Sequence, residues 1–150
     1  MADKVKELGF RANIISTDLY DSVENTIKKL FSKIENDSVI LAAGEPNIVV
    51  AKDGGEGGRN LHMGLTALGE ESIDEGALFI SFASDGIDNT PMAGAIVDKE
   101  TKQKAEKLGL KREDYLARFD SYHFFDKTGD LILTGKTGAN VSDLMILLGK

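Results

Sequence analysis

The 150-residue chain has no cysteine, and this absence excludes several classes of chemistry. A disulfide framework, a thiolate metal site and a thiol nucleophile all require cysteine. The two histidines, His62 and His123, lie far apart and lack the H-x-x-H or H-E-x-x-H spacing of a histidine metal site, and a Ser–His relay is equally disfavoured. Because the chain needs no oxidising environment, a cytoplasmic location is the default expectation.

Long apolar runs are also missing, the longest being stretches such as ALF and LMILL. About 20 apolar residues are needed to cross a bilayer, so no membrane span is expected, and MADKVKELGF lacks the apolar segment of a signal peptide. The net charge is -7 with no basic patch, which disfavours binding to nucleic acid. Hydrophobic residues make up 41% of the chain, which predicts a single globular domain over residues 1–150.

The hydrophobic pattern predicts strands that alternate with amphipathic helices. Strands are expected at 12–17, 38–44, 47–52, 77–84 and 130–135, and helices before Gly9, at 21–34, 61–68 and 93–108, and within 111–125. The short gap between 38–44 and 47–52 indicates a hairpin. Residues 144–148 fit a helix or a strand, and we favour an edge strand. The pattern predicts a layered α/β/α domain with a mostly parallel, mixed sheet.

The stretch LTGKTG, residues 133–138, contains the GKT that ends a phosphate-binding P-loop. A P-loop has the form G-x-x-x-x-G-K-[ST], but here the preceding Gly129 is one position too far away and the predicted strand lies between. We therefore expect a glycine turn at 135–140. Its backbone N–H groups, with Lys136 and Thr137, are suited to binding an anion, and a plain turn is the alternative.

The stretch GGEGGRN, residues 54–60, places four glycines before a predicted helix. Gly57 and Gly58 suit the close approach of an anion, Arg59 offers a bidentate donor, and Asn60 is a candidate helix cap. A dinucleotide fingerprint fails because Asn60 stands where its third glycine belongs. The alternative interpretation is a flexible loop with a surface arginine.

The stretch SDGIDN, residues 84–89, follows the buried strand predicted at 77–84. Carboxylates at the carboxyl end of such a strand suit a ligand crevice, where Asp85 and Asp88 are candidates to accept a proton or bind Mg²⁺. Ordinary turn chemistry is the alternative. Glu45 is a further candidate for the same crevice. Three glycine-containing loops after strands, together carrying Arg, Lys and Asp, favour a phosphorylated ligand.

Four motifs in this order resemble the C-terminal domain, called MOFRL, of the glycerate 2-kinase family, whose members often carry the name hydroxypyruvate reductase. They are GEPNIVVAKDGGEGGRNLHMGL, FASDGIDNTPMAGAIVD, FDSYHFF and DLILTGKTGANVSDL. The resemblance covers nearly the whole chain and is strongest over 44–148. It implies a cytoplasmic transferase domain that phosphorylates the 2-hydroxyl of D-glycerate with ATP and Mg²⁺, in a cleft between two α/β domains.

The resemblance also implies roles for individual residues. Its catalytic candidates are Arg59, Asp85 and Asp88, and the two aspartates are the candidate Mg²⁺ ligands. The implied substrate- or phosphate-binding residues are Gly57, Gly58, Asn60, Gly86, Lys136, Thr137, Gly138 and Asn140. The chain departs from the family pattern at Asn89, Lys136, Ala139 and Ser142, and at Pro91 and Met92, where the family has an acidic residue.

Family members carry a long N-terminal domain ahead of this region, and this chain begins about where that domain would end. Half of the cleft is therefore expected to be missing, so activity is expected to need an N-terminal kinase domain or a separate chain. A homodimer through an exposed apolar face is also expected. The alternatives are a non-catalytic module that binds a phosphorylated or carboxylated metabolite and, third, an NAD(P)H-dependent hydroxypyruvate reductase.

Overall fold

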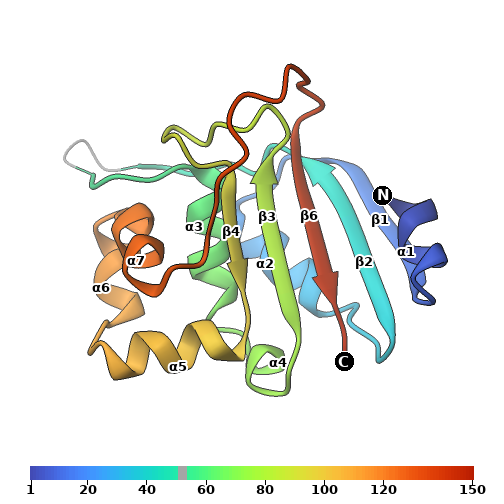
Figure 1. The fold of residues 1–150 in the computed structure, drawn as a ribbon, viewed down its shortest axis with the longest axis horizontal. Coiled ribbons are helices and arrows are strands. Elements are labelled where there is room, and N and C mark those ends of the chain that lie inside the picture. Colours follow the sequence, from blue (N-terminus) through green and yellow to red (C-terminus); the bar gives the residue numbers. More distant parts are fainter. Residues whose placement is uncertain (51–53) are drawn as a thin grey trace.

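The computed structural model describes residues 1–50 and 54–150 and is built around one six-stranded sheet (Figure 1). The strands are β1 Arg11–Leu19, β2 Ser38–Gly44, β3 Leu78–Ala83, β4 Gly94–Val97, β5 Leu131–Ile132 and β6 Asp143–Leu148. The helices are α1 Ala2–Glu7, α2 Val23–Phe31, α3 Arg59–Ala67, α4 Glu71–Asp74, α5 Lys99–Lys107, α6 Arg112–Ala117 and α7 Ser121–Thr128.

The sheet is mixed, in the order β1-β2-β6-β3-β4-β5. Strands β1 and β2 are parallel, and every other neighbouring pair is antiparallel. The predicted mixed α/β sheet is confirmed, but the expectation that it would be mostly parallel is wrong. The reason is that β6 runs in the opposite direction between β2 and β3, so that Leu148 pairs with Val39 on one side and with Leu78 on the other.

The strand predicted at 144–148 is confirmed as β6, but its expected place at the edge of the sheet is wrong. Met145 and Leu147 are buried on the helix-covered face, whereas Leu144 and Ile146 are half-buried on the opposite face. This alternation is typical of a strand, and apolar residues on both faces suit a central strand. The same residues also fit a helical spacing, which is why the sequence left both interpretations open.

The helix predicted at 93–108 is wrong over its first part. Residues 94–97 form β4, and helix α5 begins only after Asp98. The Asp98 carboxylate accepts a hydrogen bond from the Thr101 N–H at 3.0 Å, while the Thr101 hydroxyl accepts one from the Asp98 N–H. This capping box marks the start of the helix and separates it from the strand.

The hairpin predicted after β2 is also wrong for the described residues. Residues 47–50 form only an isolated bridge between Asn47 and Ser22, and positions 51–53 of the predicted strand lie outside the described residues. The chain instead follows the end of β1, where the Glu45 N–H donates to the Leu19 carbonyl at 2.8 Å. A hairpin on β2 is blocked because β6 already occupies the free edge of that strand.

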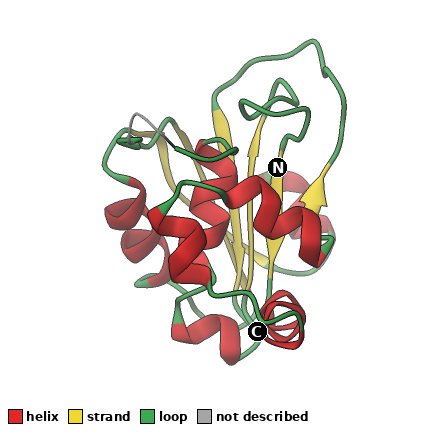
Figure 2. Cartoon of the chain, turned by 90° about the vertical axis from the view of Figure 1, so that its left-hand side faces the viewer, coloured by secondary structure: helices red, strands yellow, loops and turns green. Residues whose placement is uncertain are grey.

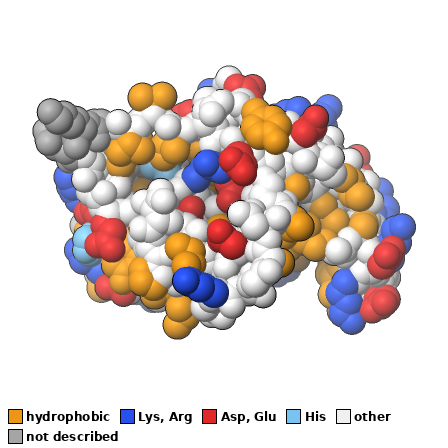
Figure 3. Space-filling view, turned by 90° about the horizontal axis from the view of Figure 1, so that it is seen from above, with side chains coloured by type: hydrophobic (Ala, Val, Ile, Leu, Met, Phe, Trp, Pro, Cys, Tyr) orange, Lys and Arg blue, Asp and Glu red, His pale blue; other side chains and the backbone are white. Residues whose placement is uncertain are grey.

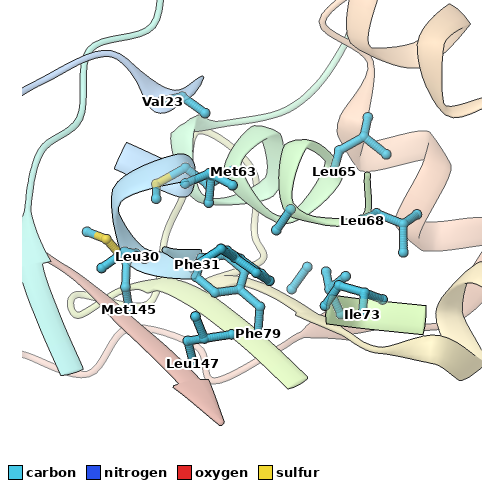
Figure 4. Close-up of a cluster of buried hydrophobic side chains, with 14 of the residues drawn as sticks. Val23, Leu30, Phe31, Met63, Leu65, Leu68, Ile73, Phe79, Met145 and Leu147 are labelled. Atoms are coloured by element: carbon cyan, nitrogen blue, oxygen red, sulfur yellow. The ribbon is translucent and has the colours of Figure 1, made fainter. Parts of the chain in front are cut away.

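The main core lies between the sheet and helices α2 and α3. Helix α2 begins at the Ser22 cap, whose side chain accepts from the Asn25 N–H, and it buries an apolar stripe that includes Ile27 and Phe31. The Phe31 and Phe79 rings pack 5.8 Å apart between centroids. Figure 4 shows these side chains meeting those of α3 and β6. Helix α3 contacts both β3 and β4, and the hydrogen bond from the Ser81 hydroxyl to Asn60 places its first turn near the carboxyl end of β3.

The opposite face of the sheet has little helical cover. In Figure 1, α2 and α3 lie behind the strands and, among the described residues, no helix lies in front of β3, β6 and β2. Helix α1 contacts β1. Half-buried apolar side chains line this face, among them Ile80, Phe82 and Ile146. The second helical layer of the predicted α/β/α arrangement is thus reduced to α1.

Within the described ranges, every helix is too short or too polar to traverse a bilayer.

Truncation of Phe79 to alanine is expected to lower the free energy of unfolding by about 3–5 kcal/mol, because the ring is fully buried and its removal leaves a cavity. Ile96→Ala, on the open face with 39% of the side chain exposed, is the control and should cost under about 1 kcal/mol. Urea denaturation measures both values. Equal losses would contradict the placement of the core.

Candidate functional site

The candidate site lies at the upper edge of the sheet, where β2 and β3 end and α3 begins (Figure 1). A cavity of about 170 Å³ opens there, and we call it the acidic cleft. Figure 3 looks down on this edge and shows acidic side chains gathered around a basic one near the centre of the face. Its charged and amide side chains are Glu45, Arg59, Asp85, Asp88, Asn89, Asn140 and Asp143.

The sheet register explains why these residues meet. Asp143, the first residue of β6, pairs with Gly44 at the end of β2 and with Ala83 at the end of β3. The two neighbouring strands run opposite to β6, so their carboxyl ends and the amino end of β6 share one edge. Asp143 therefore lies between the loop that carries Glu45 and the loop that carries Asp85.

Arg59 is held at the start of α3 by acidic partners. Its Nη1 donates to Asp143 Oδ2 at 2.6 Å and lies 3.7 Å from Glu45 Oε2. The Arg59 side chain is 31% exposed, and its buried Nε has no hydrogen-bond partner among the described residues. Buried donors normally have partners, so the guanidinium retains a donor for a ligand.

Asp88 caps helix α3 from a different loop. Its Oδ1 accepts from the Asn60 N–H at 3.1 Å and its Oδ2 from the Leu61 N–H at 2.8 Å. The first N–H groups of a helix have no partner within the helix, so this carboxylate satisfies them. The cap position itself is Gly58, where a Cβ would collide with Asp88. The cap is therefore supplied by Asp88 and not by the side chain of Asn60.

Burial raises the pKa of the Asp88 carboxyl above its ordinary value. The hydrogen bonds from the Leu61 and Asn60 backbone and from the Asn60 amide act in the opposite direction, and the neighbouring charge of Asp143 adds to the rise. Desolvation is the largest of these effects, because the carboxyl lies at the bottom of the cleft with only 6% of the residue exposed.

Asn60 connects the two carboxylates through its buried side chain. Its Nδ2 donates to Asp143 Oδ1 at 2.8 Å and to Asp88 Oδ1 at 3.2 Å, and its Oδ1 accepts from the Ser81 hydroxyl at 2.6 Å. The amide thus uses both donors and its acceptor, which fixes its orientation. Side chains from α3, β3, β6 and the loop after β3 form one polar network beneath the cleft.

The loops after β3 and β5 are joined to each other. The Thr137 hydroxyl donates to the Ser84 carbonyl at 2.5 Å, and the Thr137 N–H donates to the Asp85 carbonyl at 3.0 Å. Gly86, with φ of +90°, packs so closely on Gly135 that a side chain would not fit. Figures 1 and 2 show the segment between β5 and β6 arching above the sheet.

The segment LTGKTG leads into strand β6 and not into a helix. A P-loop feeds a helix whose N-terminus faces the phosphates, so the structure agrees with the sequence in excluding a P-loop here. Lys136 and Gly138 line a shallow hollow of about 270 Å³ beside the acidic cleft, and this hollow shares Asp85 and Asn140 with it.

The structure gathers part of the predicted set around the acidic cleft. Arg59, Asp85, Asp88 and Asn140 line the acidic cleft itself. The other predicted residues lie next to it, in the network or the adjoining hollows: Gly57, Gly58, Asn60, Gly86, Lys136, Thr137 and Gly138.

Two residues of the network were missed by the sequence analysis. Asp143 is part of the motif DLILTGKTGANVSDL, yet no role was predicted for it. Ser81 lies on the buried face of β3 between Phe79 and Ala83. A polar residue in the buried register of an apolar strand is a signal for a hydrogen-bond partner, and it marks Ser81.

The donor set of the acidic cleft limits how Mg²⁺ is held. In residues 1–50 and 54–150 no group of three or more His, Cys, Asp or Glu side chains is arranged to hold a metal ion. Asp88 already accepts three hydrogen bonds, from about four available positions. Among the residues that the structure describes, the Asp85 side chain accepts only the Ile87 N–H, at 3.0 Å, and so keeps an oxygen for a ligand. One carboxylate plus waters and substrate phosphates suits Mg²⁺ bound with a nucleotide.

Replacement of Asp88 by alanine is expected to lower the free energy of unfolding by about 1–3 kcal/mol, because the first N–H groups of α3 lose their partner in a buried place. Asp85→Ala is the matched control in the same loop. It removes one hydrogen bond near the surface, so its cost should stay under about 1 kcal/mol. Denaturant titration compares the two, and a larger loss for Asp85→Ala would refute the capping role.

Comparison with known proteins places these features in a family. The sequence profile of the MOFRL family matches residues 38–143. The chain is 36% identical over 94% of its length to a D-glycerate 2-kinase of Thermotoga maritima, and 33% identical over 99% to a glycerate 2-kinase of Pyrococcus horikoshii. It spans 36% of the length of each of these relatives.

Solved structures agree with the sequence matches. The glycerate kinase of Thermotoga maritima superposes with a TM-score of 0.88 at 33% identity, covering 99% of this chain and 38% of that one. A Pyrococcus horikoshii OT3 protein superposes with a TM-score of 0.91 at 32% identity, again over 99% of this chain and 36% of its own. The chain therefore belongs to the MOFRL family.

Proposed function

We propose that this chain is the C-terminal domain or subunit of an ATP-dependent glycerate 2-kinase, which converts D-glycerate to 2-phosphoglycerate together with an N-terminal partner domain. The observation that carries the proposal is the convergence of Arg59, Asp85 and Asn140 on the acidic cleft, from the start of α3 and from two loops far apart in sequence. A glycerate kinase needs groups for a carboxylate, for hydroxyls and for a proton, and these three residues supply them. The names of the relatives support this choice.

In the proposed complex, Arg59 binds the glycerate carboxylate. Its Nη1 is anchored by Asp143, which leaves the rest of the planar guanidinium to donate to the substrate. Asn140, which lines the acidic cleft, is the proposed hydrogen-bond partner of a glycerate hydroxyl. Asp88 orients Arg59 indirectly, because it holds the first turn of α3 from which the arginine projects.

Asp85 is the proposed acceptor for the proton of the 2-hydroxyl. As the hydroxyl oxygen bonds to the γ-phosphorus of ATP, the bond from that phosphorus to the ADP oxygen breaks and the hydroxyl proton passes to the carboxylate. Asp85 is also the carboxylate of the acidic cleft best placed to hold Mg²⁺, which neutralises phosphate charge when bound. The sequence names Asp85 and Asp88 together for these two roles, and we assign both to Asp85 because Asp88 is engaged by the first turn of α3.

The charge of the acidic cleft supports the need for a partner. Four carboxylates, Glu45, Asp85, Asp88 and Asp143, face one arginine. This wall suits hydroxyls, a carboxylate held by Arg59, and Mg²⁺, but it repels a triphosphate. Phosphoryl transfer requires positive charge around the transferring group. We therefore infer that a second domain supplies cationic groups from the other side.

A chimera tests the proposal. The segment of the Thermotoga maritima kinase that corresponds to this chain is replaced by residues 1–150, and ATP-dependent 2-phosphoglycerate formation is measured. The chimera is expected to be active, and Arg59→Ala should lower kcat/KM by about 10²–10³-fold, because a charge-paired donor to the substrate is lost. Arg11→Ala, at the exposed start of β1, is the matched control and should leave kcat/KM unchanged.

A folded chimera without kinase activity, or equal activity of Arg59→Ala and Arg11→Ala, would overturn the proposal. Thermal stabilisation of the chain by glycerate or phosphoglycerate without turnover would instead favour a non-catalytic binding module. Oxidation of NADH in the presence of hydroxypyruvate would favour the reductase.

A further inference from the structure

A second and larger cavity lies beside the acidic cleft and has no role in the proposed handling of glycerate. It measures about 570 Å³ and is bounded by the start of α2, by α3 and by the end of α6; we call it the apolar cavity. Its volume lies in the range of small-molecule sites, about 300–1,000 Å³. Apolar lining comes mainly from Ile48, Leu116 and Phe119, and His62 lies on its wall.

Phe119 is held in an unusual backbone conformation at this cavity. It follows α6 with φ of +53°, a left-handed position that favours glycine, and it is half-buried. Its ring stacks on that of His62, with centroids 5.1 Å apart and planes 17° apart. A glycine would satisfy the backbone at lower cost, so the presence of phenylalanine indicates that the ring itself is needed.

A narrow hollow of about 50 Å³ shares lining residues with both this cavity and the acidic cleft, and we call it the glycine neck. Gly57 and Gly58 line it, with Arg59 and Asn89 shared with the acidic cleft and His62 and Phe119 shared with the apolar cavity. All three spaces follow α3 from Arg59 to Thr66, a rise of about 10 Å.

Three polar atoms at the glycine neck are buried without a hydrogen-bond partner among the described residues. They are Arg59 Nε, His62 Nδ1 and Ser121 Oγ, and all three residues line this hollow. His62 is 5% exposed and Ser121 is 1% exposed. Buried polar atoms are rarely left unpaired, so three of them in residues around one space mark its wall as polar.

The three neighbouring spaces differ in the chemistry of their lining. The acidic cleft is lined mainly by charged side chains and the glycine neck by unpaired polar atoms. The apolar cavity is lined by stacked rings and aliphatic side chains, with Glu24 and Arg112 also on its wall. Burial lowers the pKa of His62, with a smaller opposing effect from Glu24, so its imidazole is neutral near pH 7. A neutral imidazole offers one donor and one acceptor, which suits a heteroaromatic edge better than an anion.

We propose that the apolar cavity binds the heteroaromatic base of the nucleotide phosphate donor, against the ring of Phe119, and that the glycine neck holds its sugar. This inference rests on the proposed function, in which ATP is the donor. It assigns the base to this domain, while the cationic groups for the phosphates come from the partner domain. Nothing in the acidic cleft is required for the base to bind.

Nuclear magnetic resonance titration of the isotopically labelled chain tests the inference, with adenosine as the probe because it carries a base and a sugar without phosphate. Adenosine is expected to shift the amide signals of Ile48, His62 and Phe119. Tripolyphosphate, which has no base, should leave these signals unchanged. Failure of adenosine to shift them, or shifts confined to another surface, would overturn the inference.

Two variants sharpen the test. Phe119→Gly suits the left-handed backbone and removes the ring, whereas Ala117→Phe fills the cavity from an exposed position on α6. Each should weaken adenosine binding by at least about tenfold, as expected for loss of a buried aromatic contact or of the space itself. Leu108→Ala, at the end of α5, removes apolar surface elsewhere and should bind as the unmodified chain does.

The outcomes separate this inference from the proposed function. Adenosine binding that depends on Phe119 in a chimera without kinase activity would support the base site and refute the proposed kinase function. An active chimera in which Phe119→Gly and Ala117→Phe leave the KM for ATP unchanged would support the kinase function and refute the base site.

Discussion

The carboxylate of Asp88 on the first turn of α3 is the interaction on which the site depends. A helix that begins inside a protein leaves backbone N–H groups without partners, and leaving them unpaired is costly. Asp88 satisfies two of them from the loop after β3, and Asn60 extends the contact to Asp143 and Ser81. The direction in which Arg59 leaves the helix is therefore fixed by groups from three other parts of the chain. The same arrangement occupies the positive end of the helix with a protein carboxylate, so a ligand anion has to be bound by Arg59 and not by the helix N-terminus.

The position of β6 is the second constraint, and it is the part of the fold that the sequence does not reveal. The hydrophobic pattern of β6 is compatible with a strand, but the sequence does not show which strands it pairs with. Its partners are β2 and β3, which lie about a hundred and about sixty residues earlier in the chain. Once β6 occupies the edge of β2, the segment after β2 has no strand to pair with there and follows the end of β1. The long-range antiparallel pairing of β6 thus excludes the hairpin on β2, and together with the antiparallel strands β4 and β5 it makes the sheet mostly antiparallel.

Local features were predictable where one physical signal dominates. The buried stripe of α2 has a helical period and a serine cap, and β2 is a short run that is apolar on both faces. The helix predicted at 93–108 failed at its start because Ala93, Ala95 and Val97 are small apolar residues compatible with either structure, and only the cap at Asp98 separates them from α5. In the site, glycine and charge patterns marked Arg59 and Asp85. Ser81 and Asp143 were missed because their importance arises from contacts across the sheet.

The three neighbouring spaces differ in charge, and this difference is the physical basis for the proposal that this chain binds glycerate and the base while a partner domain binds the phosphates. A single arginine among four carboxylates cannot neutralise a triphosphate, yet the same carboxylates suit Mg²⁺ and the hydroxyls of a small acid. The apolar cavity needs no charge, and burial keeps His62 neutral within it. Under the proposed function, the nucleotide base and the groups of glycerate match side chains of this chain, whereas for the phosphate oxygens the chain offers only Lys136 and the turn at 135–140 beside the cleft. Since transfer proceeds only when charge at those oxygens is neutralised, the proposed partner domain would contribute cationic groups at the acidic cleft.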